Sequence, residues 1–148
     1  MSVKRPETKY VAVGDSEVAY QVVGNGPSDV LWMYPLGSHV DLFWQIPAYA
    51  ESLDRLCAFS RVIILDRRGL GASGPAPDGD LPSWEVFTED IGAVLDAAQS
   101  TRAAIVSNRD TGQIAMLYAG MHPEQVSALV LLNCQRRSKT DPFPTVEN

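Results

Sequence analysis

Four short apolar runs, spaced along the chain by longer amphipathic segments, limit what this sequence can fold into more than any other feature. The runs are VLWMY at 30–34, RVIIL at 61–65, AAIV at 103–106 and ALVLL at 128–132. Near-continuous apolar runs of this length are typical of parallel strands that are buried on both faces. Helical periodicity fills the gaps at 47–59, 83–99 and 112–121. The sequence therefore predicts an α/β fold, with helices on both faces of a mostly parallel sheet.

A pair of strands is predicted ahead of this sheet. Residues 9–13 and 17–23 are rich in valine and tyrosine, and Gly14, Asp15 and Ser16 lie between them. A short polar segment that contains glycine favours a tight reversal of the chain. We therefore expect an antiparallel hairpin that leads into the parallel strands.

Two of the helices carry signals at their ends. Ser83 is expected to cap the helix of 83–99, because a serine oxygen accepts hydrogen bonds from the free N–H groups of a first turn. Pro123, directly after His122, is expected to close the helix of 112–121, because proline cannot continue the backbone hydrogen-bond ladder.

One domain over residues 1–134, followed by a tail over 135–148, accounts for the chain. A length of 148 residues with 45% hydrophobic residues is sufficient for one core. The net charge of −6 argues against a nucleic-acid partner, which requires clustered lysine and arginine. No apolar run has the length of a signal peptide or a membrane span, and we expect a cytoplasmic protein.

The sequence gives no indication of metal or cofactor chemistry. Cys57 and Cys134 are far apart and fit neither a metal-site nor a disulfide spacing, and no cofactor-binding motif is found. We therefore predict two reduced thiols, no metal and no cofactor.

Three segments resemble the first half of the α/β-hydrolase fold. They are SHVDLFWQIP at 38–47, SRVIILDRRGLGASG at 60–74 and GQIAMLYAGMHPEQVSALVLLN at 112–133. Within that superfamily, they are most similar to the hydrolase-like domain that precedes bacterial class III adenylate cyclase domains. The resemblance implies the N-terminal half of an α/β-hydrolase fold, truncated after its sixth strand.

The DRRGxGxS segment of this family is a tight turn that follows a strand. In this chain the turn contains Asp66, Arg67, Arg68, Gly69, Gly71 and Ser73. The resemblance implies a structural role for these residues. The glycines reach the positive φ that a tight reversal needs, and the charged residues serve as ion-pair and hydrogen-bond partners.

The catalytic serine of active relatives lies in a G-x-S-x-G turn between a strand and a helix. Counting back from the following helix places SNRDT, residues 107–111, in that turn, with Arg109 in the position of the serine. A guanidinium is permanently charged and has no lone pair with which to attack a carbonyl carbon. Ser107 and Thr111 replace the two glycines, and we expect the strained turn to be relaxed.

Two further parts of the catalytic machinery are affected. The resemblance assigns the oxyanion loop to Leu36, Gly37, Ser38 and His39. Pro35 precedes this loop and has no N–H group to donate. Relatives place the acid and the histidine of the triad after later strands, and His39 and His122 match neither position. We therefore predict a degenerate, truncated hydrolase-like protein without serine-hydrolase activity.

Two alternatives remain open for catalysis. Asp110, followed by Thr111 and Gly112, is similar to the Asp-x-Gly of the dehalogenase branch, in which the aspartate is the nucleophile. This register, however, shortens the following helix by one residue. The other alternative is a hydrolase of carboxylic esters that a second chain completes by supplying the missing histidine and strands.

Ligands and partners follow from the same features. Arg109 at a helix N-terminus is a candidate contact for a small anion such as a carboxylate or a phosphate, whereas an active enzyme would bind an ester. An uncovered sheet edge after the sixth strand favours a homo-oligomer or a partner chain.

Overall fold

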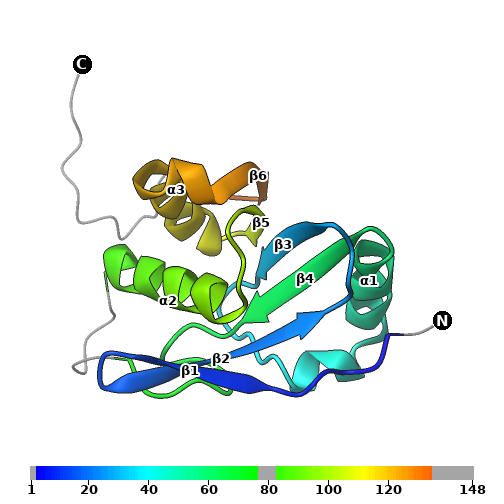
Figure 1. Cartoon of the computed structure of the whole chain (residues 1–148). Helices are drawn as coiled ribbons and strands as arrows, with labels where there is room; N and C mark the ends of the chain where they lie inside the picture. The colour runs from blue at the N-terminus through cyan, green and yellow to red at the C-terminus, as the bar shows by residue number, and fades with distance from the viewer. Residues whose placement is uncertain (1–2, 77–82, 135–148) are drawn as a thin grey trace.

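The computed structural model describes residues 3–76 and 83–134, so the predicted tail over 135–148 lies outside the described residues. Strands and helices follow one another in the predicted order (Figure 1). The strands are β1 (Lys9–Val13), β2 (Ser16–Val23), β3 (Ser28–Met33), β4 (Ser60–Leu65), β5 (Ala103–Asn108) and β6 (Val126–Leu132). The helices are α1 (Pro47–Cys57), α2 (Trp84–Ala97) and α3 (Thr111–Met121), with the 3-10 helices η1 (Leu42–Gln45) and η2 (Pro123–Gln125).

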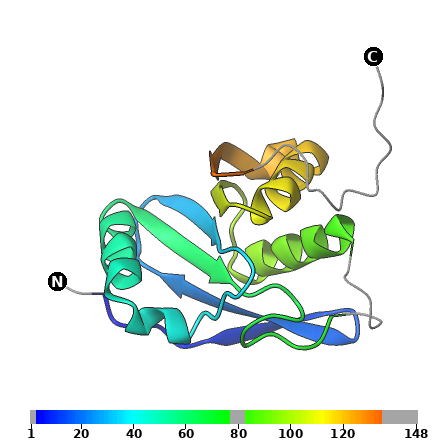
Figure 2. The same ribbon diagram turned by 180° about the vertical axis from the view of Figure 1, so that it is seen from behind.

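The strands form one sheet in the order β1-β2-β4-β3-β5-β6, with the hairpin and β6 at opposite edges (Figure 2). β1 and β2 pair antiparallel, and Gly14 has a φ of +59° in the turn between them. β2 pairs antiparallel with β4, and all pairs beyond β4 are parallel. The predicted hairpin and mostly parallel sheet are confirmed.

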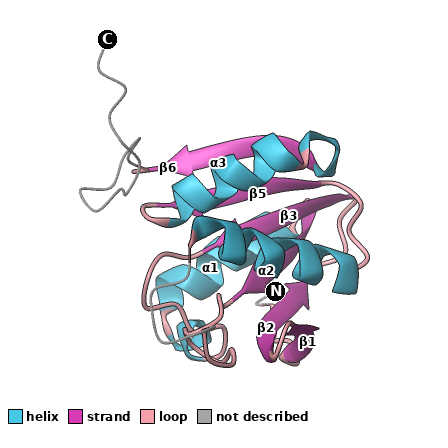
Figure 3. Cartoon of the chain, turned by 90° about the vertical axis from the view of Figure 1, so that its left-hand side faces the viewer, coloured by secondary structure: helices cyan, strands magenta, loops and turns pink. Residues whose placement is uncertain are grey.

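Helices cover both faces of this sheet, as predicted. α2 and α3 lie on one face (Figure 3), where Ile91 packs with Leu31 and Ile63. α1 lies on the other face, where Leu53 packs with Val62. The neighbouring residues Val62 and Ile63 of β4 thus face opposite cores, which explains why this strand is apolar throughout.

An aromatic cluster holds α1 and η1 against the second face. Tyr49 of α1 is its centre, and its ring centroid lies 5.0–6.0 Å from those of Trp32, Tyr34, Phe43 and Trp44. Burial raises the pKa of Tyr34 to about 12 and also raises the pKa of Tyr49. The cluster positions the loop between β3 and η1, which belongs to the candidate site.

The two predicted helix ends differ in outcome. Ser83 occupies the N-cap position of α2, but its side chain makes no capping hydrogen bond, so the prediction of a side-chain cap is wrong. Ser83 instead interacts with the Glu85 carboxylate, whose pKa is lowered by a hydrogen bond to its own backbone and by Ser83. α3 closes where predicted: the His122 N–H donates to the Tyr118 carbonyl at 2.8 Å, and Pro123 begins η2.

β6 forms an apolar edge of the sheet. Among the described residues it pairs with β5 alone, so its outer N–H and C=O groups have no strand partner. Val130, Leu131 and Leu132 are 42%, 40% and 46% exposed, and the strand contains no charged residue. Edge strands generally carry charged residues or are covered, so this edge is a candidate association surface.

Candidate functional site

The loops that follow β3, β4 and β5 meet at the carboxyl end of the parallel strands. The Val40 N–H donates to Asp66 at 3.0 Å, which joins the first loop to the second. Asp110 then accepts a hydrogen bond from the Leu36 N–H at 3.1 Å and forms an ion pair with Arg67 at 2.7 Å. Ligands of open parallel sheets bind at this edge. The structure thus brings together the predicted oxyanion loop, the DRRGxGxS turn and the turn over 107–111.

Asp66 organises the turn that follows β4. Its fully buried Oδ2 accepts hydrogen bonds from the Val40 N–H at 3.0 Å and the Ala72 N–H at 2.9 Å. The Ser73 hydroxyl donates to the Asp66 carbonyl at 2.5 Å and accepts from the Ala19 N–H of β2 at 2.8 Å. These bonds connect the turn to the β3 loop and to the hairpin.

The backbone conformation of the turn requires both of its glycines. At Gly71 there is also no room for a side chain. Gly69 has a φ of +83° and Gly71 a φ of +54°, a region that glycine reaches without steric cost. A Cβ atom on Gly71 would overlap the Asp66 carboxylate and would approach the Ser38 carbonyl oxygen within 2.7 Å. Only glycine leaves room for the buried carboxylate.

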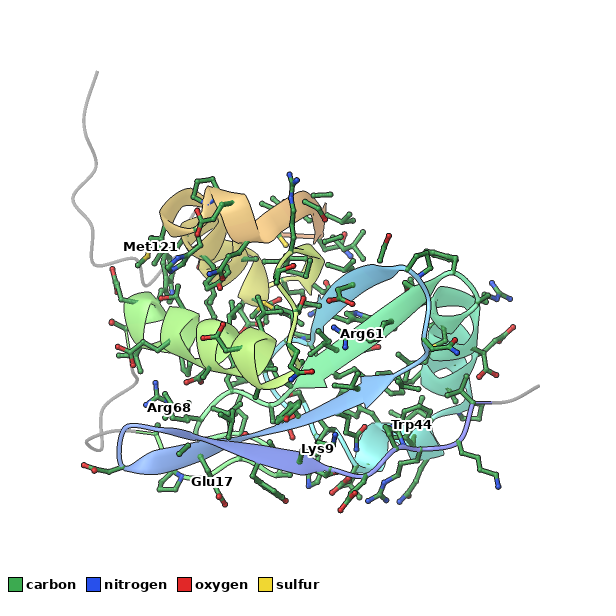
Figure 4. The ribbon with its side chains drawn as sticks, in the orientation of Figure 1. Lys9, Glu17, Trp44, Arg61, Arg68 and Met121 are labelled. Atoms are coloured by element: carbon green, nitrogen blue, oxygen red, sulfur yellow. The ribbon has the colours of Figure 1, made fainter. Side chains whose placement is uncertain are left out.

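Arg68 forms a buried ion pair with Asp90 of α2. Its Nε donates to Oδ1 of Asp90 at 2.5 Å, and its backbone N–H donates to Oδ2 at 3.0 Å. Arg68 also donates to the carbonyls of Val13 and Val86, and its side chain lies between α2 and the β1–β2 hairpin (Figure 4). Burial raises the pKa of Asp90, and the hydrogen bonds and charge of Arg68 act against that shift.

Arg109 occupies the turn between β5 and α3 with a φ of +54°. Positive φ is uncommon for residues other than glycine and is a source of strain. The expectation of a relaxed turn is therefore wrong: the replaced sequence keeps a left-handed backbone here, held by the Arg109 N–H, which donates to the Leu132 carbonyl at 3.0 Å. The Arg109 side chain is exposed and has no hydrogen bond or ion pair within the described residues.

The flanking replacements stabilise this turn internally. The buried Thr111 hydroxyl accepts a hydrogen bond from the Asn108 N–H at 2.9 Å and lies 2.8 Å from the Asn108 carbonyl, to which it can donate. Ser107 is fully buried, with its hydroxyl 3.9 Å from the sulfur of Cys134. That sulfur also occupies the space that a Cβ atom on Gly112 would need.

The Asp110 carboxylate links the β3 loop to the turn after β4. Its Oδ1 accepts the Leu36 N–H at 3.1 Å, and its Oδ2 accepts from Nη2 of Arg67 at 2.7 Å. It holds the N-cap position of α3, but its carboxylate makes no capping hydrogen bond. The carboxylate considered as an alternative nucleophile is thus already bound through both oxygen atoms.

The predicted oxyanion loop connects β3 to η1. The Leu36 N–H is the first donor after Pro35, and it is bound to Asp110. Gly37 has a φ of +91° in open space, and Ser38 is buried. His39 Nδ1 accepts the Asp41 N–H at 3.3 Å, which is a local contact within the loop.

His122 lies at the opposite end of α3 from Arg109. An 11-residue helix separates the two positions, a length of roughly 16 Å at the usual helical rise. The His122 ring lies 4.7 Å from the Tyr118 ring, and its Nδ1 is 3.8 Å from the Glu124 carboxylate. These contacts place it outside the candidate site.

Sequence reasoning missed the contacts of Asp110 and the role of Asp90. No local pattern signals a contact between Asp110 and Leu36, which are 74 positions apart. Asp90, by contrast, lies among the apolar positions Phe87, Ile91 and Val94 of one helical face. A charged residue within an apolar stripe indicates a buried ion pair, so this signal was available.

Over 3–76 and 83–134, no group of three or more histidine, cysteine, aspartate or glutamate residues could hold a metal ion. No helix in the same ranges is long and apolar enough to cross a membrane.

Comparisons with known proteins support the fold. No family model matches the chain. It is 26% identical over 124 residues to epoxide hydrolase 4 of Mus musculus, covering 84% of this chain and 34% of the relative. It is 30% identical over 73 residues to a serine hydrolase-like protein of Danio rerio, covering 49% of this chain and 22% of the relative. A hydrolase from Pseudomonas aeruginosa superposes with a TM-score of 0.76 at 24% identity, covering 90% of this chain and 48% of that structure.

This chain spans less than half the length of each of these proteins. The chain therefore has an α/β-hydrolase-type fold over the part that it covers, and over that part it is similar to proteins named hydrolases.

Proposed function

We propose that this chain is a hydrolase-like module without serine-hydrolase activity of its own. The observation that carries the proposal is the Asp110 carboxylate, which binds the Leu36 N–H and Arg67 beside the turn where Arg109 replaces the nucleophile. Acyl transfer needs an activated nucleophile and free donors for the developing oxyanion. Arg109 cannot supply the first, and Asp110 occupies a donor that would contribute to the second.

The proposal is tested with p-nitrophenyl acetate and with styrene oxide, the latter because one relative is named an epoxide hydrolase. We expect turnover at the rate of buffer for both substrates, since loss of a nucleophile costs on the order of a millionfold in rate. An Arg109→Ser variant should also stay at that rate, because His39 Nδ1 accepts the Asp41 N–H within its own loop and His122 lies at the other end of α3.

One result would contradict the proposal, and another would favour the alternative of an enzyme that a second chain completes. Ester turnover well above buffer that disappears in Asp110→Asn would identify Asp110 as the nucleophile. Turnover that appears only after a second protein is added would support the ester hydrolase completed by another chain.

The finer resemblance concerns the branch of the superfamily. We propose that the chain is nearest to the hydrolase-like domains that precede class III adenylate cyclases. Support comes from the segments 38–47, 60–74 and 112–133, which resemble those domains.

We also propose that the outer edge of β6 is an association surface for a second copy of the chain. A two-fold axis across an edge strand brings each residue near its own symmetry mate, so like charges would repel. β6 contains no charged residue, and its exposed leucines would be buried in such a contact.

Light scattering after gel filtration is expected to give a dimer for the wild type and a monomer for Val130→Lys. Leu42→Lys is the matched control, because Leu42 is 53% exposed but lies on η1, and it should leave the dimer intact. A wild-type monomer at all concentrations would contradict the proposal.

A further inference from the structure

We infer that the Leu36 N–H and the Arg67 guanidinium form a carboxylate-binding site, which the chain fills with its own Asp110. The inference rests on the proposed function in one respect, namely that this carboxylate is a bound group and not a nucleophile. It assigns a ligand class, small monocarboxylates, to a place at which the sequence suggested only an anion near Arg109.

The geometry is that of a two-point carboxylate site. Each oxygen of Asp110 has its own donor, a backbone N–H at 3.1 Å and a guanidinium nitrogen at 2.7 Å. Hydrogen bonds that carry a charge, such as the second, are roughly twice as strong as neutral ones. The donors come from the β3 loop and the β4 turn, whereas the carboxylate comes from a third segment.

The environment of the Arg67 guanidinium favours a bound anion. Its side chain is only 8% exposed, and its guanidinium carbon lies 4.9 Å from the centre of the Phe87 ring. Its buried Nε has no hydrogen-bond partner among the described residues. A buried guanidinium without a counter-charge is costly. Removal of Asp110 would therefore leave a site that favours another carboxylate.

Asp110 is suited to be displaced or replaced. Its side chain is 44% exposed, so the two donors are reachable from solvent once the carboxylate is absent. The carboxylate makes no capping hydrogen bond to α3, and its loss should leave the helix start intact. Asp110→Ala removes a carboxylate group and nothing else, and formate has the size and charge of the missing group.

The test compares thermal unfolding in sodium formate and in sodium chloride at equal ionic strength. Formate is expected to raise the Tm of Asp110→Ala by about 3–6 °C at ten times its dissociation constant. The wild type should not respond, because its own carboxylate holds the site. The Leu36 amide resonance should shift with formate in the variant and stay unchanged in the wild type.

Asp29→Ala is the matched control. Asp29 binds Arg61 through both oxygens at 2.7 Å at the other end of the strands, and within residues 3–76 and 83–134 its carboxylate has no backbone N–H donor. This variant therefore tests whether an arginine that has lost its carboxylate partner is sufficient to bind formate, and we expect no formate response. Arg67→Met added to Asp110→Ala should abolish the response.

The inference is overturned if Asp110→Ala responds no more than the wild type, or if Asp29→Ala responds equally. If Asp110→Ala does not fold in chloride, its refolding yield in formate and in chloride is compared, and equal yields overturn the inference. Ester hydrolysis by the wild type together with a formate response in Asp110→Ala would remove the proposed function and leave the site. A wild type without ester hydrolysis, together with no formate response in Asp110→Ala, would leave the proposed function and remove the carboxylate site.

Discussion

Replacing Asp90 with alanine is expected to lower the free energy of unfolding by about 3–5 kcal/mol, the usual cost of removing one partner from a buried ion pair. Asp90 is fully buried and binds both the Nε and the backbone N–H of Arg68. The variant leaves the Arg68 charge buried against Val13 and Val86. Urea denaturation followed by circular dichroism measures the loss.

Glu89→Ala is the control for this prediction. Glu89 is the neighbouring residue and contacts the same arginine at 3.2 Å, but its side chain is 64% exposed. Exposed pairs contribute little, so we expect a change below about 0.5 kcal/mol. Equal losses for both variants would show that burial is not the cause. Arg68→Met combined with Asp90→Leu should recover much of the loss, because an apolar pair avoids desolvation.

Gly71→Ala is expected to destabilise the fold by about 2–4 kcal/mol, combining the strain of a positive φ with overpacking. The added methyl group would overlap the Asp66 carboxylate. Displacement of that carboxylate would break its bonds from Val40 and Ala72. Denaturation gives the energy, and the amide resonances of Val40 and Ala72 report the broken bonds.

Gly37→Ala separates the two contributions. Gly37 also has a positive φ, of +91°, but no atom of the residues that the structure describes lies within 4 Å of the position of its added Cβ. This variant should cost only the backbone strain, on the order of 1 kcal/mol. A Gly71→Ala variant that is no less stable than Gly37→Ala would refute the role assigned to the Asp66 contacts.

The contacts behind these two predictions lie around the turn after β4. The contacts of Asp66 and Arg68 hold the turn after β4 to the β3 loop, to the hairpin and to α2. None of them involves Arg109. These contacts are therefore independent of the side chain at position 109, and the ion pair between Asp110 and Arg67 adds a link between the turn after β4 and the turn after β5.

Most of the fold could be predicted from the sequence alone. The runs at 30–34 and 61–65 indicated buried parallel strands because both faces of these strands are apolar, a property that depends only on neighbouring residues. The hairpin could be predicted for the same local reason. The order of the strands could not, because β4 lies between β2 and β3 through pairings between residues far apart in the chain.

The candidate site divides in the same way. The sequence by itself predicted a guanidinium at the position that the resemblance assigns to the serine, because counting residues along the chain needs no coordinates. Only the tertiary structure decided what surrounds it: the positive φ of Arg109, and the carboxylate of Asp110 bound to Leu36 and Arg67. Such contacts join separate loops, and their geometry is set by the packing of helices on the sheet and not by any local pattern.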